Sequence, residues 1–158
     1  MNIRKAKLSD AQTLSCLALS LGEFYNDDDP SGISPYFAQK ISPEGFETYL
    51  SNQEAYEHYV YEEAEKIVGY FALLNETHFL YLLVDKAYHK KGIATALIDH
   101  ALNGKEHKLY TVNASLYAVP FYKKLGFVPS ALVQKHYGMS YQPMVWDRVI
   151  KKEKVSEV

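Results

Sequence analysis

Residues 82–95 constrain this chain most, because an apolar strand is followed there by a basic, small-residue turn and then by a helix. The first turn of a helix has backbone N–H groups without intrahelical partners and carries the positive end of the helix dipole, so it binds anions. Gly92 and Ala94 keep this turn free of bulk, and Lys90 and Lys91 add positive charge just before the helix. The segment lacks the longer loop and trailing Lys-Ser/Thr of a P-loop. It therefore predicts a diphosphate site outside the nucleoside-triphosphatase class.

This segment resembles motif A of the GNAT acetyltransferase superfamily, whose pattern is Leu-x-Val-x-Pro, two spacers and then Gln/Arg-x-x-Gly-x-Gly/Ala. Lys86 stands where the family usually has proline, and His89 stands where it usually has Gln or Arg. The family holds the coenzyme A pyrophosphate mainly by backbone amides of this loop, so neither departure removes the main donors. An imidazole at His89 could also make the affinity pH-sensitive. Without the resemblance, the segment reads as an ordinary strand–helix junction with a solvated lysine pair.

A second segment resembles motif B of the same superfamily, in which Asn-Ala-Ser is followed by Phe-Tyr-x-x-x-Gly-Phe. Residues 112–115 read Val-Asn-Ala-Ser, and residues 118–127 read Ala-Val-Pro-Phe-Tyr-Lys-Lys-Leu-Gly-Phe. The residues themselves predict a buried strand, a helix capped by Ser115, and an end of that helix at Gly126 in a left-handed conformation. Both motifs occur in the family's order and at its separation, and the resemblance covers essentially the whole chain.

Length and composition limit the fold and the function classes. A chain of 158 residues, 47% of them hydrophobic and 23% charged, is long enough for one domain with a sizeable core. A net charge of -2 gives no global basic excess for nucleic acid, and no apolar run approaches a membrane span or a signal peptide. We therefore expect a cytoplasmic protein with a single acetyltransferase domain over 1–150 and a frayed tail over 151–158. Its one cysteine, Cys16, is expected in the core.

Hydrophobic periodicity and turn residues predict the order of the elements. Strands are expected at 2–7, 56–62, 67–75, 78–84, 108–114, 131–137 and 144–149, and helices at 9–21, from 42 onward, at 92–103 and at 115–125. The first helix is expected to begin with a capping box at Ser9, and the second with a cap at Ser42. The resemblance implies a mixed α+β, GNAT-like fold. Its central sheet has six to seven mostly antiparallel strands, a splay between the fourth and fifth, and flanking helices.

The resemblance implies that acetyl-CoA is the acetyl donor and that a primary amine attacks the thioester directly in a ternary complex, without a metal. The cofactor would lie where the strands ending near Val84 and Asn113 separate. The backbone around Leu83 and Val84 would hold the pantetheine and polarise the thioester carbonyl, and Asn113 would hold the pantetheine amides from the other side. The residues expected to bind the cofactor are Leu82, Leu83, Val84, His89, Lys90, Lys91, Gly92, Ile93, Ala94, Thr95, Asn113 and Ser115.

Tyr122 is the residue that the resemblance favours as general acid, since it occupies the tyrosine position of motif B. A phenol with a reference pKa of about 10 stays protonated and can donate to a leaving sulfur. Packing is the alternative role in a chain with 14 tyrosines. His78 is the candidate general base, because many family members carry a glutamate at that strand position and imidazole titrates in a useful range. A satisfied polar contact is the other interpretation of His78. Glu23 is an alternative base, and an amine that arrives already neutral would need no protein base.

The acceptor surface in this family is built largely from the first two helices and their connection. That connection mixes acids with aromatics, and we expect Glu23, Tyr25 and Asp27 to contact a small cationic amine. The three aspartates at 27–29 could instead form a solvated turn, and a peptide N-terminus or a protein lysine stays open as the acceptor. The alternative function is a catalytically silent acyl-CoA-binding or regulatory domain, which the presence of Tyr122 and Asn113 disfavours. A homodimer is left open.

Overall fold

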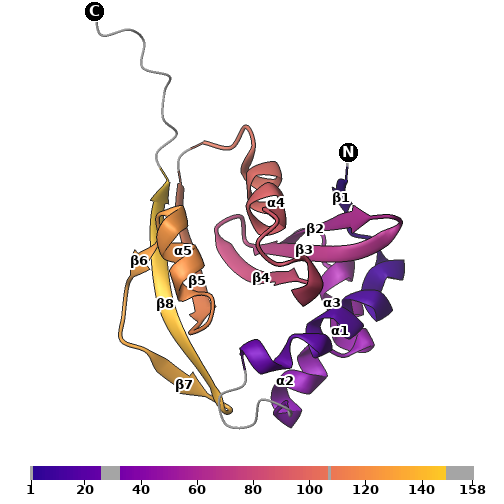
Figure 1. Cartoon of the computed structure of the whole chain (residues 1–158), viewed down its shortest axis with the longest axis horizontal. Helices are drawn as coiled ribbons and strands as arrows, with labels where there is room; N and C mark the ends of the chain where they lie inside the picture. Colours follow the sequence, from indigo (N-terminus) through magenta and orange to yellow (C-terminus); the bar gives the residue numbers. More distant parts are fainter. Residues whose placement is uncertain (1, 26–32, 107, 149–158) are drawn as a thin grey trace, which may run out of the picture.

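A computed structural model describes residues 2–25, 33–106 and 108–148. Their strands form one eight-stranded sheet in the order β1-β2-β3-β4-β5-β8-β6, with β7 paired to β8 (Figure 1). Neighbouring strands are antiparallel except β4 and β5, which run parallel. The strands are β1 (Ile3–Lys5), β2 (Tyr56–Glu63), β3 (Lys66–Leu74), β4 (His78–Val84), β5 (Lys108–Ser115), β6 (Val128–Pro129), β7 (Gln134–His136) and β8 (Met139–Arg148). This confirms the expected mixed, mostly antiparallel sheet, with β6 as an additional short strand.

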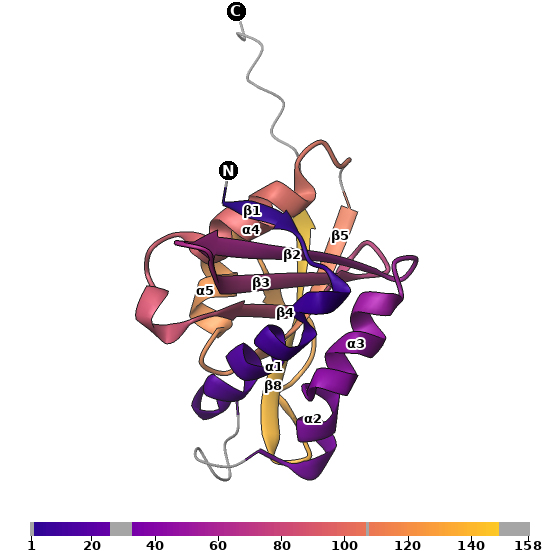
Figure 2. The ribbon, with the colours of Figure 1, turned by 90° about the vertical axis from the view of Figure 1, so that its right-hand side faces the viewer.

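Helices cover both faces of the half of the sheet that contains β1 to β4 (Figure 2). The helices are α1 (Ala11–Ser20), α2 (Pro35–Lys40), α3 (Pro43–Ser51), α4 (Ile93–Leu102) and α5 (Val119–Leu125), with 3-10 turns η1 (Leu8–Asp10), η2 (Gly22–Phe24) and η3 (Lys86–Tyr88). One core cluster joins α4 to the sheet and a second joins α1 and α3 to it. Strand β3 is therefore buried on both faces, which explains its continuous apolar run. Within the described residues, no helix is long and apolar enough to cross a membrane.

Helices α2 and α3 each begin with a serine cap that is followed by proline. The Ser34 hydroxyl accepts the Phe37 N–H at 3.3 Å, and the Ser42 hydroxyl accepts the Gly45 N–H at 3.0 Å. The hydrogen bond at Ser42 confirms the cap expected there. Proline suits the position after each cap, because it fixes a helical φ where no N–H is needed. The cap at Ser34 and the short helix α2 that follows it were not expected.

Two other expected caps are wrong. Asp10, rather than Ser9, accepts a backbone N–H at the start of α1, from Lys7 at 2.7 Å. Ser115 belongs to the end of β5, and α5 begins only at Val119, after the N-cap residue Ala118. The sheet ladder between β5 and β8 continues through Ser115 and so keeps that residue extended. The predicted end of α5 at Gly126 is confirmed by a φ of +127°.

Further differences concern Cys16 and the C-terminal strands. Cys16 is exposed, because Ala11, Leu14 and Ala18 occupy the face of α1 that packs on the sheet. Strand β8 begins at Met139 rather than at 144, since residues 141–148 pair with β5 and Met139 and Ser140 pair with β7. Pro143 interrupts the sequence pattern, yet its carbonyl still accepts the Ser130 N–H at 3.0 Å. The expected tail at 151–158 lies outside the described residues.

The splay between β4 and β5 positions the site. The two strands share only the register pairs His78↔Thr111 and Phe79↔Val112. Beyond Phe79, β4 continues to Val84 while paired with β3 alone, and β5 continues to Ser115 while paired with β8. The cleft between the two halves of the sheet therefore opens toward the C-terminal ends of both strands. This confirms the splay between the fourth and fifth strands.

Candidate active site

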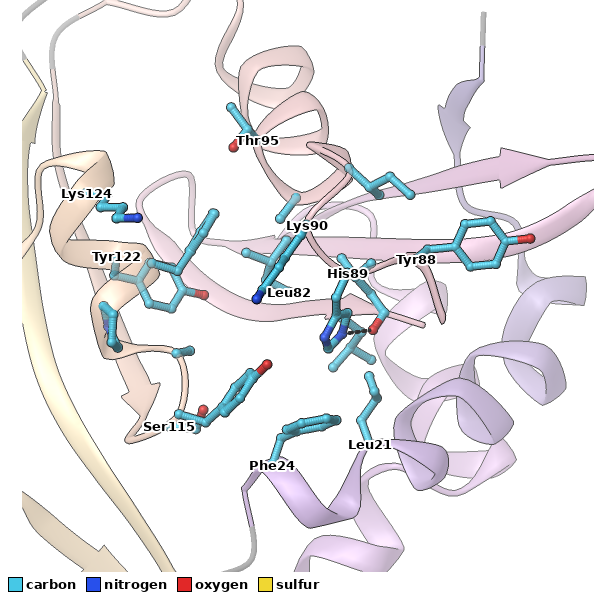
Figure 3. Close-up of a pocket in the computed structure, with 18 of the residues that line it drawn as sticks. Leu21, Phe24, Leu82, Tyr88, His89, Lys90, Thr95, Ser115, Tyr122 and Lys124 are labelled. Carbon is cyan, nitrogen blue, oxygen red and sulfur yellow. Dashed lines mark hydrogen bonds between the residues drawn. The ribbon is translucent and has the colours of Figure 1, made fainter. Parts of the chain in front are cut away.

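A cavity of about 630 Å³ lies at the open end of the splay. Its wall contains many of the residues predicted to form the site: Tyr25, Leu82, Leu83, Val84, His89, Lys90, Gly92, Ile93, Ala94, Thr95, Ser115 and Tyr122. These residues come from η2 and its end, β4, the turn before α4, the start of α4, the end of β5, and α5. Thr95 and Lys124 lie at one end of the cavity, and Phe24 and Ser115 lie at the other (Figure 3). One elongated ligand could therefore reach every part of this wall.

The start of α4 forms the anion-binding part of the wall. The first intrahelical bond runs from the Ala96 N–H to the Gly92 carbonyl at 3.0 Å, so the amides of Ile93, Ala94 and Thr95 precede the helical ladder. Gly92 caps the helix with a φ of +78°, and a Cβ built there meets no atom within 4 Å. The space before these amides is thus open, and the helix dipole is positive there. This arrangement fits the diphosphate of coenzyme A.

The two lysines before α4 point in different directions. Lys90 lines the cavity, and Figure 3 shows its side chain directed into it. The Lys91 ammonium instead lies over the Tyr88 ring, 5.1 Å from its centroid. Lys91 was predicted to bind the cofactor, yet it is not part of the cavity wall, whereas Lys90 is. A second lysine in the wall, Lys124 of α5, was not among the predicted residues.

His89 braces the turn between β4 and α4. Its Nε2–H donates to the Val84 carbonyl at 2.7 Å, and its ring lies 5.4 Å from the Phe24 ring, centroid to centroid. The hydrogen bond fixes the ring against the end of β4 on the cavity wall (Figure 3). The family pattern has Gln or Arg at this position. His89 also carries a hydrogen-bond donor, and that donor links the turn to β4.

Tyr122 combines a buried ring with a hydroxyl at the cavity. The ring is 5% exposed and packs against Phe127 and Phe79, with centroid distances of 5.4 and 6.4 Å. Figure 3 shows the hydroxyl directed into the cavity. Burial raises the pKa of Tyr122 above its ordinary value, because the phenolate would be poorly solvated there. Tyr122 is therefore a neutral proton donor at the cavity wall over the ordinary pH range.

Comparison with known proteins agrees with this geometry. A family model described as an acetyltransferase (GNAT) domain matches residues 25–148, which is most of the chain. The chain belongs to the GNAT acetyltransferase family. A search of curated protein sequences found no significant match.

Solved GNAT structures share the fold. A GCN5-related N-acetyltransferase from Rhodopseudomonas palustris aligns with a TM-score of 0.74 and 19% identity, over 92% of this chain and 94% of that one. The PaiA N-acetyltransferase from Thermoplasma acidophilum, solved with coenzyme A, has a TM-score of 0.68 and 16% identity over 92% and 98% of the two chains. A variant of the spermidine N-acetyltransferase SpeG from Vibrio cholerae has a TM-score of 0.64 and 18% identity over 92% and 94%. At these identities the likeness is one of fold.

Some residues predicted for this GNAT site lie outside the cavity wall. His78 is at the closed end of the splay, where its Nδ1 is hydrogen-bonded to the Thr111 hydroxyl at 2.8 Å. Burial lowers its pKa, so the ring is held neutral in a satisfied polar contact. Asn113 is an exposed residue of β5, opposite Pro143 of β8, and does not reach the cavity. The structure therefore does not bring His78 or Asn113 to the reacting region.

On the acceptor side, the structure brings only part of the predicted set to the cavity. Tyr25 lines it, and its hydroxyl donates to the Ala18 carbonyl at the end of α1. Glu23 lies outside the wall and forms an exposed ion pair with Lys86 at 2.9 Å. Asp27 lies outside the described residues.

Several residues of the wall were missed by reasoning from the sequence. They are Leu21, Phe24, Tyr88, Tyr117, Ala118, Pro120, Phe121 and Lys124. Phe121, Pro120 and Ala118 lie within motif B, where the helix phase could have indicated them once the start of α5 was known. Phe24 and Tyr117 meet with ring centroids 4.5 Å apart although they are far apart in sequence. No local pattern could have paired those two rings.

The charged side chains of the described cavity wall are Lys90 and Lys124, beside His89. Lysines suit the phosphate groups of a cofactor better than they suit a cationic acceptor. In the part of the chain that the structure describes, no group of His, Cys, Asp or Glu side chains is arranged to hold a metal ion. The cavity wall thus combines the backbone amides of α4 and two lysines with the hydroxyls of serine, threonine and tyrosine side chains.

Proposed function

We propose that this GNAT protein transfers the acetyl group of acetyl-CoA to a primary amine by direct attack in a ternary complex. One observation carries the proposal: the free amides at the start of α4 and the hydroxyl of Tyr122 face the same cavity. The first can hold a diphosphate, and the second can supply a proton. A site with both groups has what an acyl-CoA-dependent transfer needs for cofactor binding and for acid catalysis.

The chain has donors for the full length of an extended cofactor. The amides of Ile93, Ala94 and Thr95 would hold the diphosphate, with Lys90 adding charge. After Phe79, the edge of β4 that faces the cleft has no partner strand among the described residues. Its backbone groups could therefore pair with the amides of a pantetheine arm, as a sheet edge pairs with an extended peptide.

The chemistry would be a single displacement in which the chain moves one proton. When bound, acetyl-CoA supplies an acetyl group activated as a thioester. Backbone N–H groups of β4 near Leu82 would polarise the thioester carbonyl. As the amine nitrogen forms the C–N bond and the C–S bond breaks, Tyr122 Oη would donate its proton to the departing sulfur. The amine would lose its proton to water, and Tyr122 would regain a proton from water. We assign His78 no part in this transfer, since it is engaged with Thr111 at the closed end of the splay.

The proposal is tested by isothermal titration with acetyl-CoA, followed by a thiol-release assay across a panel of primary amines, peptides with free N-termini and lysine-containing peptides. We expect saturable acetyl-CoA binding, and thiol release that depends on a small amine. Binding without turnover on any acceptor would instead indicate a silent acyl-CoA-binding domain. Absence of binding would also overturn the proposed diphosphate site at the start of α4.

A further inference from the structure

The cleft is held together at both ends by different kinds of contact. At the closed end, two pairs of the β4–β5 ladder and the hydrogen bond between His78 and Thr111 join the halves of the sheet. At the open end, no strand pairing joins β4 to β5 within the described residues. Among the described residues, aromatic side chains make contacts across this end. We distinguish an inner and an outer contact.

The inner contact is that of Phe24 with Tyr117, both of which line the cavity. The outer contact joins Tyr36 of α2 to Tyr137 at the tip of the β7–β8 hairpin. These two rings are stacked, with centroids 4.1 Å apart and planes 20° apart. We call Tyr36 and Tyr137 the aromatic clasp. Figure 1 shows that this hairpin tip lies beside α2.

The clasp is connected to both walls of the cavity. On one side, Phe37, which follows Tyr36, packs against Tyr25 of the cavity wall with ring centroids 5.1 Å apart. On the other side, Tyr141 of β8 is the register partner of Ser115, which lines the opposite wall. The clasp therefore bridges the two walls of the cleft at the side where η2 and α2 lie.

The backbone at Tyr137 shows that this ring is placed against local preference. Tyr137 has a φ of +50° and Gly138 a φ of +79°, between the paired residues His136 and Met139. A two-residue hairpin turn with both φ values positive favours Asn, Asp or Gly at its first position. A bulky residue there is disfavoured, and such outliers point to a role beyond folding. Tyr137 meets that description because its ring leaves the turn to stack on Tyr36.

The contact is also exposed enough to open. Tyr36 is 42% exposed and Tyr137 is 53% exposed. The neighbours that reinforce the clasp are equally superficial: Lys40 lies over the Tyr36 ring at 5.0 Å, and the His136 ring lies 5.9 Å from that of Tyr36. An aromatic pair that stays this exposed to water contributes little stabilisation to the closed arrangement. It can give way to a ligand without unfolding the hairpin.

We propose that Tyr36 and Tyr137 are specificity-determining residues that close the acceptor end of the cleft and limit the size of the amine. This inference rests on the acetyl transfer proposed above. A small amine passes beneath the closed clasp, whereas a bulky amine must separate the two rings. The clasp lies away from the start of α4, so it leaves cofactor binding unaffected.

The test compares Tyr137→Asn, which supplies a residue that the turn favours, with Tyr137→Phe, which keeps the stacking ring. For each variant, kcat/KM is measured with a small alkylamine and with a bulky arylalkylamine, and the Kd of acetyl-CoA is measured by titration. We expect Tyr137→Asn to raise the ratio of kcat/KM for the bulky amine to that for the small one by about fivefold. Tyr137→Phe should keep the parent ratio, and the Kd of acetyl-CoA should not change in either variant.

Tyr36→Ala tests the same contact from α2, independently of the hairpin turn, and should raise the ratio similarly. An active parent whose ratio is unchanged in both Tyr137→Asn and Tyr36→Ala would overturn the clasp and leave the proposed function standing. A parent that acetylates no amine would overturn the proposed function and the clasp's role with it. A rise in the ratio that Tyr137→Phe shares would also contradict the proposal, because the ring would not be its cause.

Discussion

Tyr122 is the residue through which we propose that the protein delivers a proton to the leaving sulfur. Its ring belongs to the core cluster under α4, while its hydroxyl faces the cavity (Figure 3). A residue that only packed would gain nothing from a hydroxyl at that place. Because burial raises the pKa of Tyr122, the proton stays on the phenol throughout the pH range in which the protein would be assayed. Any loss of activity at mildly alkaline pH must then come from another group.

We predict that Tyr122→Phe lowers kcat by about 100-fold, at the low end of general acid catalysis, since a thiol is already a fair leaving group. The Kd of acetyl-CoA should stay unchanged, because the ring and its contacts remain. Single-turnover acetyl transfer, measured beside acetyl-CoA titration, separates the two effects. Transfer by Tyr122→Phe at the parent rate would remove Tyr122 from the mechanism.

The two lysines before α4 give a second prediction at this scale. Lys90→Ala should weaken acetyl-CoA binding by about 1 kcal/mol or less, and added salt should reduce that difference. Lys91→Ala should have a smaller effect, since its ammonium lies over Tyr88 and outside the cavity wall. Titrations of both variants at low and high ionic strength provide the measurement. Equal effects of the two substitutions would contradict the orientation that the structure gives them.

Single residues were predictable from the sequence only where a motif fixed their role. Tyr122, Ser115, Lys90 and Gly92 lie in the cavity wall, as motif spacing predicted, whereas Asn113 of motif B and Lys91 lie outside it. His78 was chosen for its chemistry and for its place on a strand. The sequence does not show that β4 and β5 pair just there, with Thr111 beside the ring. Phe24 and Tyr117 meet only through the tertiary fold, so no pattern along the chain predicts their contact.

At the scale of elements, the start of α4 is the place where we propose that backbone amides bind the diphosphate. Gly92 caps this helix with a positive φ and has open space where a Cβ would stand. Gly104, in the turn after α4, offers a matched control. It also has a positive φ, +75°, and a Cβ built on it also meets nothing within 4 Å. Gly104 does not line the cavity.

We predict that Gly92→Val and Gly104→Val each lower the free energy of unfolding by about 1–2 kcal/mol, the cost of the left-handed conformation for a residue with a Cβ. Only Gly92→Val should also weaken acetyl-CoA, by about tenfold or more, because its side chain would occupy the space before the α4 amides. Urea unfolding and titration of both variants test this. Unchanged acetyl-CoA affinity in a folded Gly92→Val protein would refute the proposed diphosphate site at the start of α4.

The elements that the sequence failed to predict are short and held by distant partners. Helix α2 has six residues and no fully buried side chain, so its apolar periodicity is weak. Strand β6 has two residues and exists only as a partner of β8. The three-residue strand β7 lies within the strand predicted at 131–137. The long elements, β3 and α4 among them, were predictable because burial on one or both faces sets the sequence pattern along their whole length. The aromatic clasp joins Tyr36 of the unpredicted helix α2 to Tyr137 in the turn between β7 and β8, so no local pattern could have paired its rings.

At the scale of the whole molecule, a charged cluster ties the N-terminal strand to the first helix and to β2. Arg4 donates to both carboxylate oxygens of Asp10, at 2.9 and 3.0 Å, and to Glu62 at 2.7 Å. Burial acts to raise the pKa of Asp10, but the bonds from Arg4 and from the Lys7 N–H outweigh it and lower that pKa overall. Since the pKa is depressed in the folded state, the stabilisation is complete above the unfolded value of about 3.9 and is lost as pH falls through the folded one.

We therefore predict that stability declines as pH falls below about 4, and that Asp10→Asn makes this decline shallower. At neutral pH, Asp10→Asn should lower the free energy of unfolding by about 2 kcal/mol, because Arg4 loses its bidentate partner. Urea unfolding of both proteins from pH 7 down to pH 3 measures the two effects. Parallel pH profiles for parent and variant would show that Asp10 contributes nothing to acid sensitivity.

The architecture as a whole combines a half packed on both faces with a cleft. The half from β1 to β4 is covered by helices on both faces, whereas β5 and β8 diverge from it after two register pairs. The sequence indicated this arrangement because the two motifs mark the ends of β4 and β5 and the elements that follow them. The central claim is that such a cleft brings a bound acetyl thioester and an amine together, so that the C–N bond forms as the C–S bond breaks.

Rapid-quench single turnover tests that claim most directly, with the protein in excess over acetyl-CoA and an amine that supports thiol release. The acetylated amine, the free thiol and the intact mass of the protein are measured in the same samples. Direct transfer predicts that acetylated amine and free thiol appear together, while the mass of the protein stays that of the unmodified chain. An acetylated protein that accumulates before the product, or free thiol without acetylated amine, would contradict the account.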